Sequence, residues 1–466
     1  MADDTQRLLR DIDAFCGRTG IAQTTFGRLA VNDGKFVARA RSGATVREKT
    51  RERVYTFIRE VDHGERKIKG RSNRKHEVAT RTMLASMAAK STIPRSFSGP
   101  EQHELRQRHH HFINTCNERW ILADRAFDVL SKLPVQRPAL RLFDASLGDG
   151  TVLTRVLRAS HKANPTLPHI VVTKERALDD LRNSLGKMAD RFLEHPLMVL
   201  VITNLNFKSA VSLKTDSLQS AMALNWQDVP LEGNTAYDFQ QQISALHAKI
   251  ATEWMATDKP EEARGPKRPI VIVLYRSDYR YVLDSLIPKP GGPSMEYDFI
   301  IGAHLFRHRA STEFKVGAVL RPLYEALAPG GRLFFAQAHG NDPGHEIIRR
   351  VWPGGDEWFI SRHEVIRALR KESWGRVPEP RITGITDKQS LFRYDMHTLP
   401  VDPQGPIGTS TLFAAWNNAT FVAQVPQVDV DEVMRGGIDY LSTTADVIKE
   451  CGGLWFINES FVLSRY

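Results

Sequence analysis

The sequence predicts an α/β protein, in which a doubly wound, mostly parallel Rossmann-like sheet is preceded by a small all-α domain. From Arg141 onwards short apolar runs alternate with helical stretches, whereas residues 1–62 show helical patterns only. The length of 466 residues suits one large core with a small attached domain. No apolar run approaches the ~18 uncharged residues that a membrane span needs, so we expect no such span.

Six apolar runs define the expected sheet. They are RLFDASLGDG, HIVVTKE, LMVLVITNLNF, PIVIVLYRSD, YDFIIGAHLF and GRLFFAQAHG. Apolar runs interleaved with helices are typical of strands that are covered on both faces, so they predict a parallel sheet. Ligands of such sheets bind beyond the carboxyl ends of the strands. The residues that follow each run are therefore the candidates for function.

The first run leads into a glycine-bearing turn and then a helix, in the stretch FDASLGDGTVLTRVLR. Gly148 and Gly150 let the backbone turn sharply, and the start of the helix offers free N–H groups to an anion. The second run is followed by Glu175, whose carboxylate can accept both hydroxyls of a ribose. The GxGxxG spacing of nicotinamide-binding proteins is missing, which disfavours that cofactor.

These pieces, together with the later LYEALAPGGRLFFAQA, resemble in their order the class I S-adenosylmethionine-dependent methyltransferases. The resemblance covers roughly residues 115–340 and implies that S-adenosylmethionine is the cofactor. The residues it assigns to cofactor binding are Asp144, Ser146, Gly148, Gly150 and Glu175. Ser146 stands where the family usually has its first glycine. The resemblance also implies that TLFAAWNNATFVAQV and LWFINESFVLSRY form the family's last two antiparallel strands.

A long insertion, at about residues 205–295, separates the expected third and fourth strands and contains an apolar run of its own, PIVIVLYRSDYRYVLD. The assignment of these two strands is therefore open. Asn204 is the expected residue near the adenine if LMVLVIT is the third strand, and Asp278 takes that place otherwise. We prefer Asn204.

Two classes of methyl acceptor, the amino groups of DNA bases and cytosine C5, are disfavoured by missing motifs. The D/N/S-Pro-Pro-aromatic motif of amino-directed DNA methyltransferases is absent from TNLNF, and no cysteine follows a proline as the nucleophile of cytosine C5 methyltransferases does. Small molecules, lipids and protein groups remain. Transfer of a methyl group to an oxygen or nitrogen needs a base. The candidate is His304, which directly follows the apolar run YDFIIGA. His308 and His339 follow the same logic.

The basic charge is concentrated in the first quarter of the chain. Residues 1–110 hold 23 Lys+Arg against 13 Asp+Glu, so the whole net charge of +10 lies there. A basic module points to a polyanion partner. The stretch RTGIAQTTFGRLA resembles helix-turn-helix modules of the phage-repressor type, which implies that residues 1–110 bind double-stranded DNA. The residues expected to contact it are Gln23, Thr24, Thr25, Arg28, Arg39 and Arg41. A helical cap or a dimerisation module has similar apolar spacing, so a homodimer is also considered.

We expect three parts: a helix-turn-helix-like domain at 1–62, a basic linker or arm at 63–110, and a methyltransferase-like domain at 111–466 with a C-terminal extension. The start, MADDTQRLLRDIDAF, is acidic and amphipathic rather than a secretory signal, which favours the cytoplasm. No metal site is expected, because the three cysteines lack CxxC spacing and His109 to His111 point in three directions on a helix.

The sequence therefore predicts a methyltransferase that uses S-adenosylmethionine, with an N-terminal module for DNA binding or recruitment. The alternative hypothesis is a DNA-binding transcriptional regulator whose methyltransferase-like body senses the cofactor without catalysis.

Overall fold

The computed structural model describes residues 2–19, 21, 23–42, 44–62, 100–134, 138–254, 268–353, 359–375, 377–402 and 404–466. The chain divides into two compact units, Met1–Ile93 and Pro94–Tyr466, which are described separately. Most of the expected basic arm, residues 63–99, lies outside the described residues.

The first unit is all-α, as predicted. Its helices are α1 (Ala2–Thr19), α2 (Gln23–Val31), α3 (Phe36–Arg41) and α4 (Glu48–Asp62). Their apolar positions recur every three or four residues, which gives each helix one buried stripe. Phe15, Phe26 and Phe57 meet edge to face at the centre, with ring centroids 5.5 to 5.9 Å apart. The unit therefore has a core of its own.

The second unit is built on one ten-stranded sheet in the order β4-β5-β3-β2-β1-β6-β7-β10-β8, with β9 also paired to β10. The strands are β1 (Leu140–Asp144), β2 (His169–Lys174), β3 (Met198–Thr203), β4 (Asn225–Leu231), β5 (Ile270–Arg276), β6 (Tyr297–Ala303), β7 (Leu327–Ala338), β8 (Arg381–Thr383), β9 (Leu391–Asp395) and β10 (Trp455–Ser464). The central five, β3-β2-β1-β6-β7, are parallel. The mostly parallel sheet expected from the sequence is confirmed.

Antiparallel strands flank this parallel centre on both sides. β10 runs antiparallel to β7, as expected for the last strand, and β5 runs antiparallel to β3. The insertion thus contributes β4 and β5 as an extension of the sheet, and β6 is the fourth parallel strand. This removes the ambiguity between the third and fourth strands.

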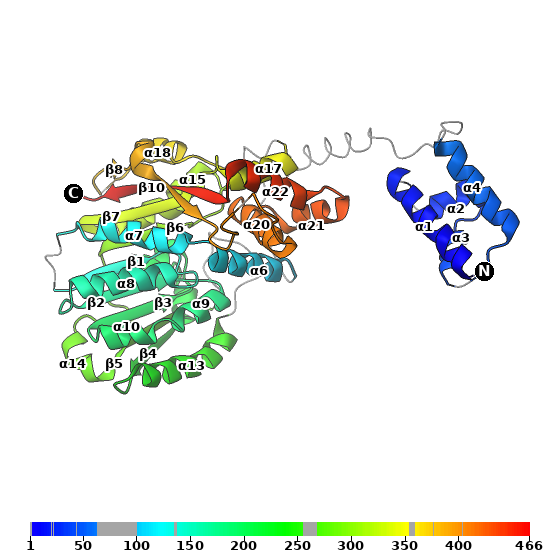
Figure 1. Ribbon diagram of the computed structural model, residues 1–466. Coiled ribbons are helices and arrows are strands. Elements are labelled where there is room, and N and C mark those ends of the chain that lie inside the picture. The colour runs from blue at the N-terminus through cyan, green and yellow to red at the C-terminus, as the bar shows by residue number, and fades with distance from the viewer. Residues whose placement is uncertain are drawn as a thin grey trace. The chain divides into compact units, whose positions relative to one another are not determined.

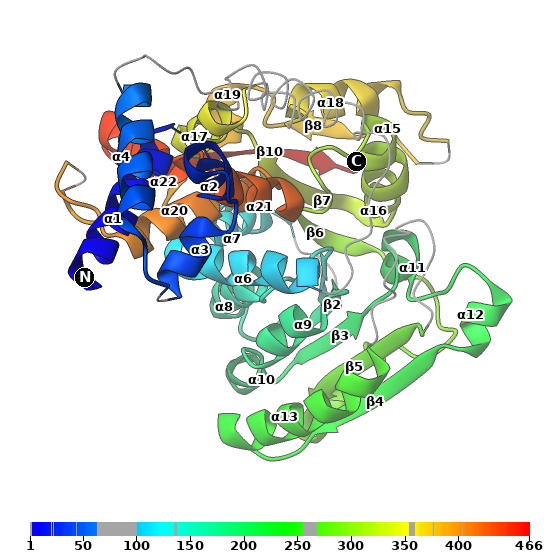
Figure 2. The same ribbon diagram turned by 90° about the vertical axis from the view of Figure 1, so that its right-hand side faces the viewer.

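Helices cover both faces of the sheet, which Figure 2 shows nearly edge-on. One apolar layer packs beneath α7 (Glu118–Leu130), α8 (Thr151–Ala163), α9 (Leu178–Leu185), α10 (Ala189–Glu194) and α13 (Ala236–Glu253). The other layer lies beneath α11 (Phe207–Ser212), α14 (Arg280–Leu283), the π-helical turn η2 (Lys315–Leu320), α16 (Arg321–Glu325) and α18 (Arg362–Lys371). Short elements complete the chain: α12 (Leu218–Met222), η1 (Ser277–Tyr279), α15 (Thr312–Phe314) and α19 (Asp387–Ser390).

Five further helices gather at one edge of the sheet and form a helical cap (Figure 1). They are α6 (Pro100–Thr115), α17 (Pro343–Val351), α20 (Thr409–Val422), α21 (Gln427–Gly436) and α22 (Tyr440–Cys451). Stacking of Trp352 on Trp416, with centroids 5.4 Å apart, joins α17 to α20. Because α17 follows directly from β7, the cap stands over the carboxyl ends of the parallel strands.

The strand expected at TLFAAWNNATFVAQV is wrong, since this stretch forms the helix α20. Six consecutive residues from Ala415 to Thr420 are buried, so the helix is enclosed on nearly every side. This buried half shows no helical period of apolar residues, so periodicity does not distinguish it from a buried strand. The places beside β10 are taken by β8 and β9 instead.

The expected boundary at residue 110 falls inside α6, which packs on α20. In the second half of this helix Arg108 is buried and donates to the carbonyl of Val425 at 3.3 Å from both terminal nitrogens. Within the described ranges, no helix is long and apolar enough to cross a membrane.

Candidate active site

The glycine loop joins the carboxyl end of β1 to α8. Gly148 and Gly150 have φ values of +54° and +78°, a left-handed backbone that favours glycine. A Cβ placed on Gly150 would lie 2.7 Å from Cβ of Ser184 in α9. The second glycine is therefore needed both for the turn and for the close approach of α9.

Asp144, at the end of β1, is buried beneath this loop and accepts a hydrogen bond from the Ser146 backbone N–H at 3.1 Å. Burial raises the pKa of Asp144 to about 7, although the bond from Ser146 opposes this rise. Ser146 is not among the residues with positive φ. A side chain at the family's usual first glycine position thus causes no backbone strain here.

Glu175 ties the second strand to the glycine loop. Its Oε2 accepts the Gly148 backbone N–H at 2.8 Å, and its Oε1 accepts those of Arg176 and Ala177 at 2.6 and 2.8 Å. The sequence predicted that Gly148 and Glu175 serve one site, and the fold brings them into contact. The half-buried carboxylate also stabilises the start of α9, because it satisfies N–H groups ahead of the first helical turn.

Arg119 of α7 lies beside the loop and was not anticipated from the sequence. Its Nη2 is 2.9 Å from Nε2 of His109, and its Nε lies 3.9 Å from Glu118 Oε2 and 4.0 Å from Asp149 Oδ1. A Cβ on Gly148 would be 3.6 Å from Arg119 Nη1. The buried Nε makes no hydrogen bond within the described part of the chain. An anion-binding group is thus held next to the glycine loop.

Asp149 lies between two cations, this arginine and Lys187. Lys187 donates to Asp149 Oδ2 at 2.6 Å and to its backbone carbonyl at 2.8 Å. Burial alone would raise the pKa of Asp149, but Arg119 and Lys187 together lower it to about 2. Burial and Arg119 lower the pKa of His109 to about 3, so its imidazole is neutral. No local pattern in the sequence marks this group, because its members come from α6, α7, the glycine loop and the segment after α9.

His304, the predicted base, follows β6 directly. Its Nε2 is 2.8 Å from Oε1 of Glu118, and the Asn458 side-chain amide donates to the same oxygen at 2.7 Å. Burial would raise the pKa of Glu118, but His304, Arg119 and Asn458 together lower it to about 2. With an ionised partner on Nε2, the neutral imidazole keeps its proton there and offers Nδ1 as the basic atom.

The other two histidines differ in their accessibility. His308 is buried and its Nε2 bonds to the carbonyl of Val422 at 3.0 Å, and burial lowers its pKa to about 3. His339 is a quarter exposed and its Nδ1 lies 3.1 Å from Oε2 of the fully buried Glu459. His304 and His339 thus repeat one motif, a histidine after a parallel strand paired with a buried glutamate.

The two residues considered for the adenine are placed differently. Asn204 follows β3, but its amide donates to the carbonyl of Arg268 and accepts the Ile270 N–H, both at 2.9 Å. Its side chain thus holds the start of β5. Asp278 follows β5, which runs antiparallel to β3, so Asp278 lies at the opposite edge from the glycine loop.

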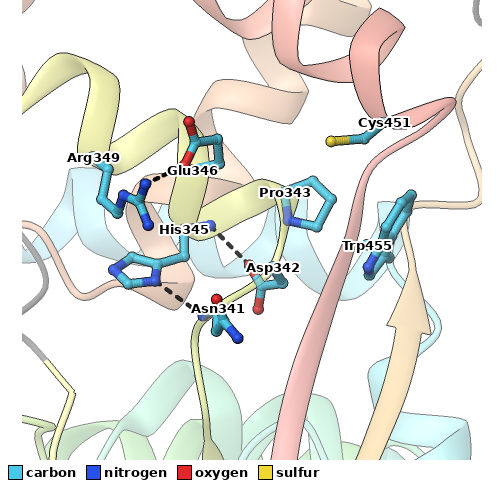
Figure 3. A pocket seen from close by; sticks show the side chains of 8 residues that line it. All are labelled: Asn341, Asp342, Pro343, His345, Glu346, Arg349, Cys451 and Trp455. Carbon is cyan, nitrogen blue, oxygen red and sulfur yellow. Dashed lines mark hydrogen bonds and ion pairs between the residues drawn. The ribbon is translucent and has the colours of Figure 1, made fainter.

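A pocket of about 260 Å³ opens beyond the carboxyl end of β7, at the start of α17. Figure 3 shows Asn341, Asp342 and Pro343 on one side, with Cys451 and Trp455 facing them from α22 and β10. None of the residues predicted for cofactor binding lines it. The pocket is therefore separate from the glycine loop.

The residues predicted for nucleic-acid contact belong to the first unit. Three of them are exposed on α2: Thr24, Thr25 and Arg28. Gln23 and Arg41 both donate to Asp13, at 2.6 and 2.7 Å, and Arg39 pairs with Asp33. Exposed ion pairs of this kind contribute little stability, so these cations remain available for exchange to another anion.

No protein-family model and no curated protein matches this chain. Among solved structures, one described as a putative class I S-adenosylmethionine-dependent methyltransferase from Listeria monocytogenes matches at 9% identity with a TM-score of 0.28, over 100% of this chain and 88% of that one. A geranyl diphosphate methyltransferase matches at 9% identity with a TM-score of 0.25, over 74% of this chain and 78% of that one. An O-methyltransferase family protein from Burkholderia thailandensis matches at 14% identity with a TM-score of 0.24, over 64% of each chain.

Likenesses at this level carry no argument for this chain, and the strand order itself defines the fold. Five parallel strands with the glycine loop after β1, an acid after β2 and an antiparallel strand beside β7 reproduce the arrangement expected from the sequence. This chain therefore has the doubly wound, mostly parallel Rossmann-like fold that the sequence predicts.

Proposed function

We propose that this protein is a methyltransferase that uses S-adenosylmethionine. The observation that carries the proposal is the 2.8 Å hydrogen bond between the Gly148 N–H and Glu175, which joins the loop after β1 to the acid after β2. Ligands of open α/β sheets bind at this edge.

The residues at the site fit the polar groups of the cofactor. Its ammonium needs acidic partners, which the buried Asp144 supplies. Its carboxylate needs a cation or N–H donors, and Arg119 has a buried Nε without a hydrogen bond. Its ribose hydroxyls need an acceptor, which Glu175 offers beside Ser146, Gly148 and Gly150. Asn204 fits less well, because its amide is already paired.

The cofactor supplies an activated methyl group on a sulfonium. The protein's own part is to hold the acceptor in line and to remove its proton. We assign this proton transfer to Nδ1 of His304, with Glu118 holding the ring through Nε2. The acceptor is then an oxygen or nitrogen of a small molecule, a lipid or a protein group.

Calorimetry with S-adenosylmethionine and S-adenosylhomocysteine tests the proposal. Binding is expected, and Glu175→Gln and Asp144→Asn should each weaken it more than tenfold. The exposed Glu432→Gln is the control and should bind as the parent does. Absence of heat at millimolar ligand, where a Kd of 1 mM corresponds to about −4 kcal/mol, would refute it.

The second candidate function is a DNA-binding regulator whose body binds the cofactor without turnover. Its support is the concentration of charge: residues 63–99 hold 9 Lys+Arg against 2 Asp+Glu, whereas residues 1–62 hold 12 against 9. In both proposals residues 1–110 serve DNA binding or recruitment. Production of S-adenosylhomocysteine in a cell extract favours the enzyme, and cofactor binding without any turnover favours the regulator.

A further inference from the structure

Three buried histidines meet at the edge of the sheet opposite the glycine loop. His161 comes from the last turn of α8, His169 is the first residue of β2, and His195 follows α10. Their exposed fractions are 4%, 0% and 1%. Since His169 begins its strand and the glycine loop follows the end of β1, the cluster lies away from the proposed active site.

The cluster is compact enough for three ring nitrogens to approach one point. One nitrogen from each residue lies within 4.8 Å of the others. The ring centroids are 4.1 to 4.8 Å apart, and His161 stacks on His195. The nitrogens of a tetrahedral zinc site, with Zn–N bonds of about 2.0 to 2.1 Å, are about 3.4 Å apart. Closure therefore requires only side-chain rotation.

The hydrogen bonds of two rings select the tautomers that a metal needs. Nδ1 of His169 and Nε2 of His195 are both 2.8 Å from the carbonyl oxygen of Leu167. A carbonyl only accepts, so each of these nitrogens carries the proton. The opposite nitrogens, Nε2 of His169 and Nδ1 of His195, then keep their lone pairs. Metal-binding histidines are oriented in this way by outer carbonyls.

A packing role alone does not explain why His161 is a histidine. Neither of its ring nitrogens has a hydrogen bond within the described residues, although the side chain is buried. A buried polar group without a partner is costly.

We propose that His161, His169 and His195 bind a zinc ion that stabilises this edge of the sheet. His169 ligates through Nε2 and His195 through Nδ1, and His161 gains the partner that it lacks. Ser160, whose Oγ is 2.7 Å from Nε2 of His169, lies next to the ion and gives up that hydrogen bond. A water molecule as the fourth ligand completes a tetrahedral site.

Arg191 is a charged neighbour of the cluster, and a salt bridge to Glu194 offsets its charge. Arg191 is buried close to the cluster, but both its terminal nitrogens bond to Glu194, at 2.5 and 2.6 Å. The pair is neutral overall. The sequence did not suggest this site, because the three histidines are 8 and 26 positions apart and match no short ligand motif.

The test uses the untagged full-length protein after treatment with a chelator. Calorimetry with zinc should show one tight site, and zinc should raise the midpoint of thermal unfolding. Cobalt should give the absorption bands of tetrahedral coordination. His161→Gln and His195→Gln should each weaken zinc binding at least tenfold, whereas His363→Gln, at an exposed histidine, should not.

Two outcomes would overturn the proposal. One is the absence of zinc binding by the chelated parent protein at micromolar zinc, a result that depends on no variant. The other is zinc binding that survives unchanged in both cluster variants, which would place the ion elsewhere, for instance on one of the three cysteines. If a variant fails to fold, Ser160→Ala gives a milder test. Losing the hydroxyl bond that competes for Nε2 of His169 should raise zinc affinity, whereas His363→Gln should leave it unchanged.

Discussion

Nε2 of His304 lies 2.8 Å from Oε1 of Glu118, a contact between residues 186 positions apart. His304 follows β6 and has a positive φ of 51°, and its backbone N–H donates to the carbonyl of Ala336 at 2.9 Å. The ring is thus held both by its backbone and by a buried carboxylate. A histidine constrained in this way is suited to remove one proton in a defined direction.

Replacing His304 by Gln should lower the rate of methyl transfer by about 10²-fold or more, because a positioned base contributes roughly 10² to 10⁴. Glu118→Gln should lower it by about 10- to 100-fold, since the ring loses its ionised partner but not its place. Formation of S-adenosylhomocysteine, with cell extract as the source of acceptor, measures both.

Cofactor affinity is the control for this pair, and it should change less than threefold in either variant. His339→Gln separates the two histidine–glutamate pairs. A larger loss of rate in His339→Gln than in His304→Gln would transfer the role of base to His339.

Gly150→Ala should destabilise the protein by about 2 to 5 kcal/mol, because a left-handed backbone at a non-glycine residue costs about 1 to 2 kcal/mol and overpacking about 1 to 3 kcal/mol. Gly330→Ala is the matched control, since Gly330 has a similar φ of +81° but open space around its Cβ position. It should cost only about 1 to 2 kcal/mol. Urea unfolding measures both, and equal losses would show that contact with Ser184 adds nothing.

Asp144→Asn should reveal the cost of the buried carboxyl through its dependence on pH. The pKa of Asp144 is raised to about 7 in the folded protein, above the unfolded value of about 3.9, so the folded state holds this proton more tightly. Stability from this group is therefore fully present below about pH 4 and is lost as pH rises to about 7. Over that range the free energy of unfolding of the asparagine variant should rise, relative to that of the parent, by on the order of 4 kcal/mol.

Urea unfolding of the ligand-free protein between pH 4 and pH 8 measures this difference. Asp190→Asn, at an exposed aspartate of α10, is the control and should show no such trend. A constant difference between Asp144→Asn and the parent across the range would mean that Asp144 is ionised throughout.

The salt dependence of DNA binding tests the first unit. If the full chain binds duplex through phosphates, the logarithm of affinity should fall with the logarithm of salt by about 0.9 per contact. Removing Arg28, Arg39 and Arg41 together should flatten the slope by about two to three units. The matched control removes Arg367, Arg370 and Arg435, which are exposed on the second unit. Equal slopes in both triple variants would contradict a role for α2 and α3.

The sequence by itself determined the parallel centre of the sheet and the polar groups at its carboxyl edge. Each central strand is an uninterrupted apolar run, because both of its faces are covered. Asp144, Gly148 and Glu175 follow such runs directly, so their placement depends only on strand order. The same logic placed His304 and His339 at this edge.

Only the tertiary structure decided the partners of these residues and the character of the chain's enclosed segments. Arg119 and Glu118 belong to a helix that precedes β1, and nothing local marks them as neighbours of Gly148 and His304. The helix α20 was mistaken for a strand because burial on nearly every side removes the helical period from its sequence. The cluster of His161, His169 and His195 likewise exists only because the end of α8, the start of β2 and the end of α10 meet at the same place. Such contacts depend on how elements pack, and packing joins residues whose separation along the chain carries no signal.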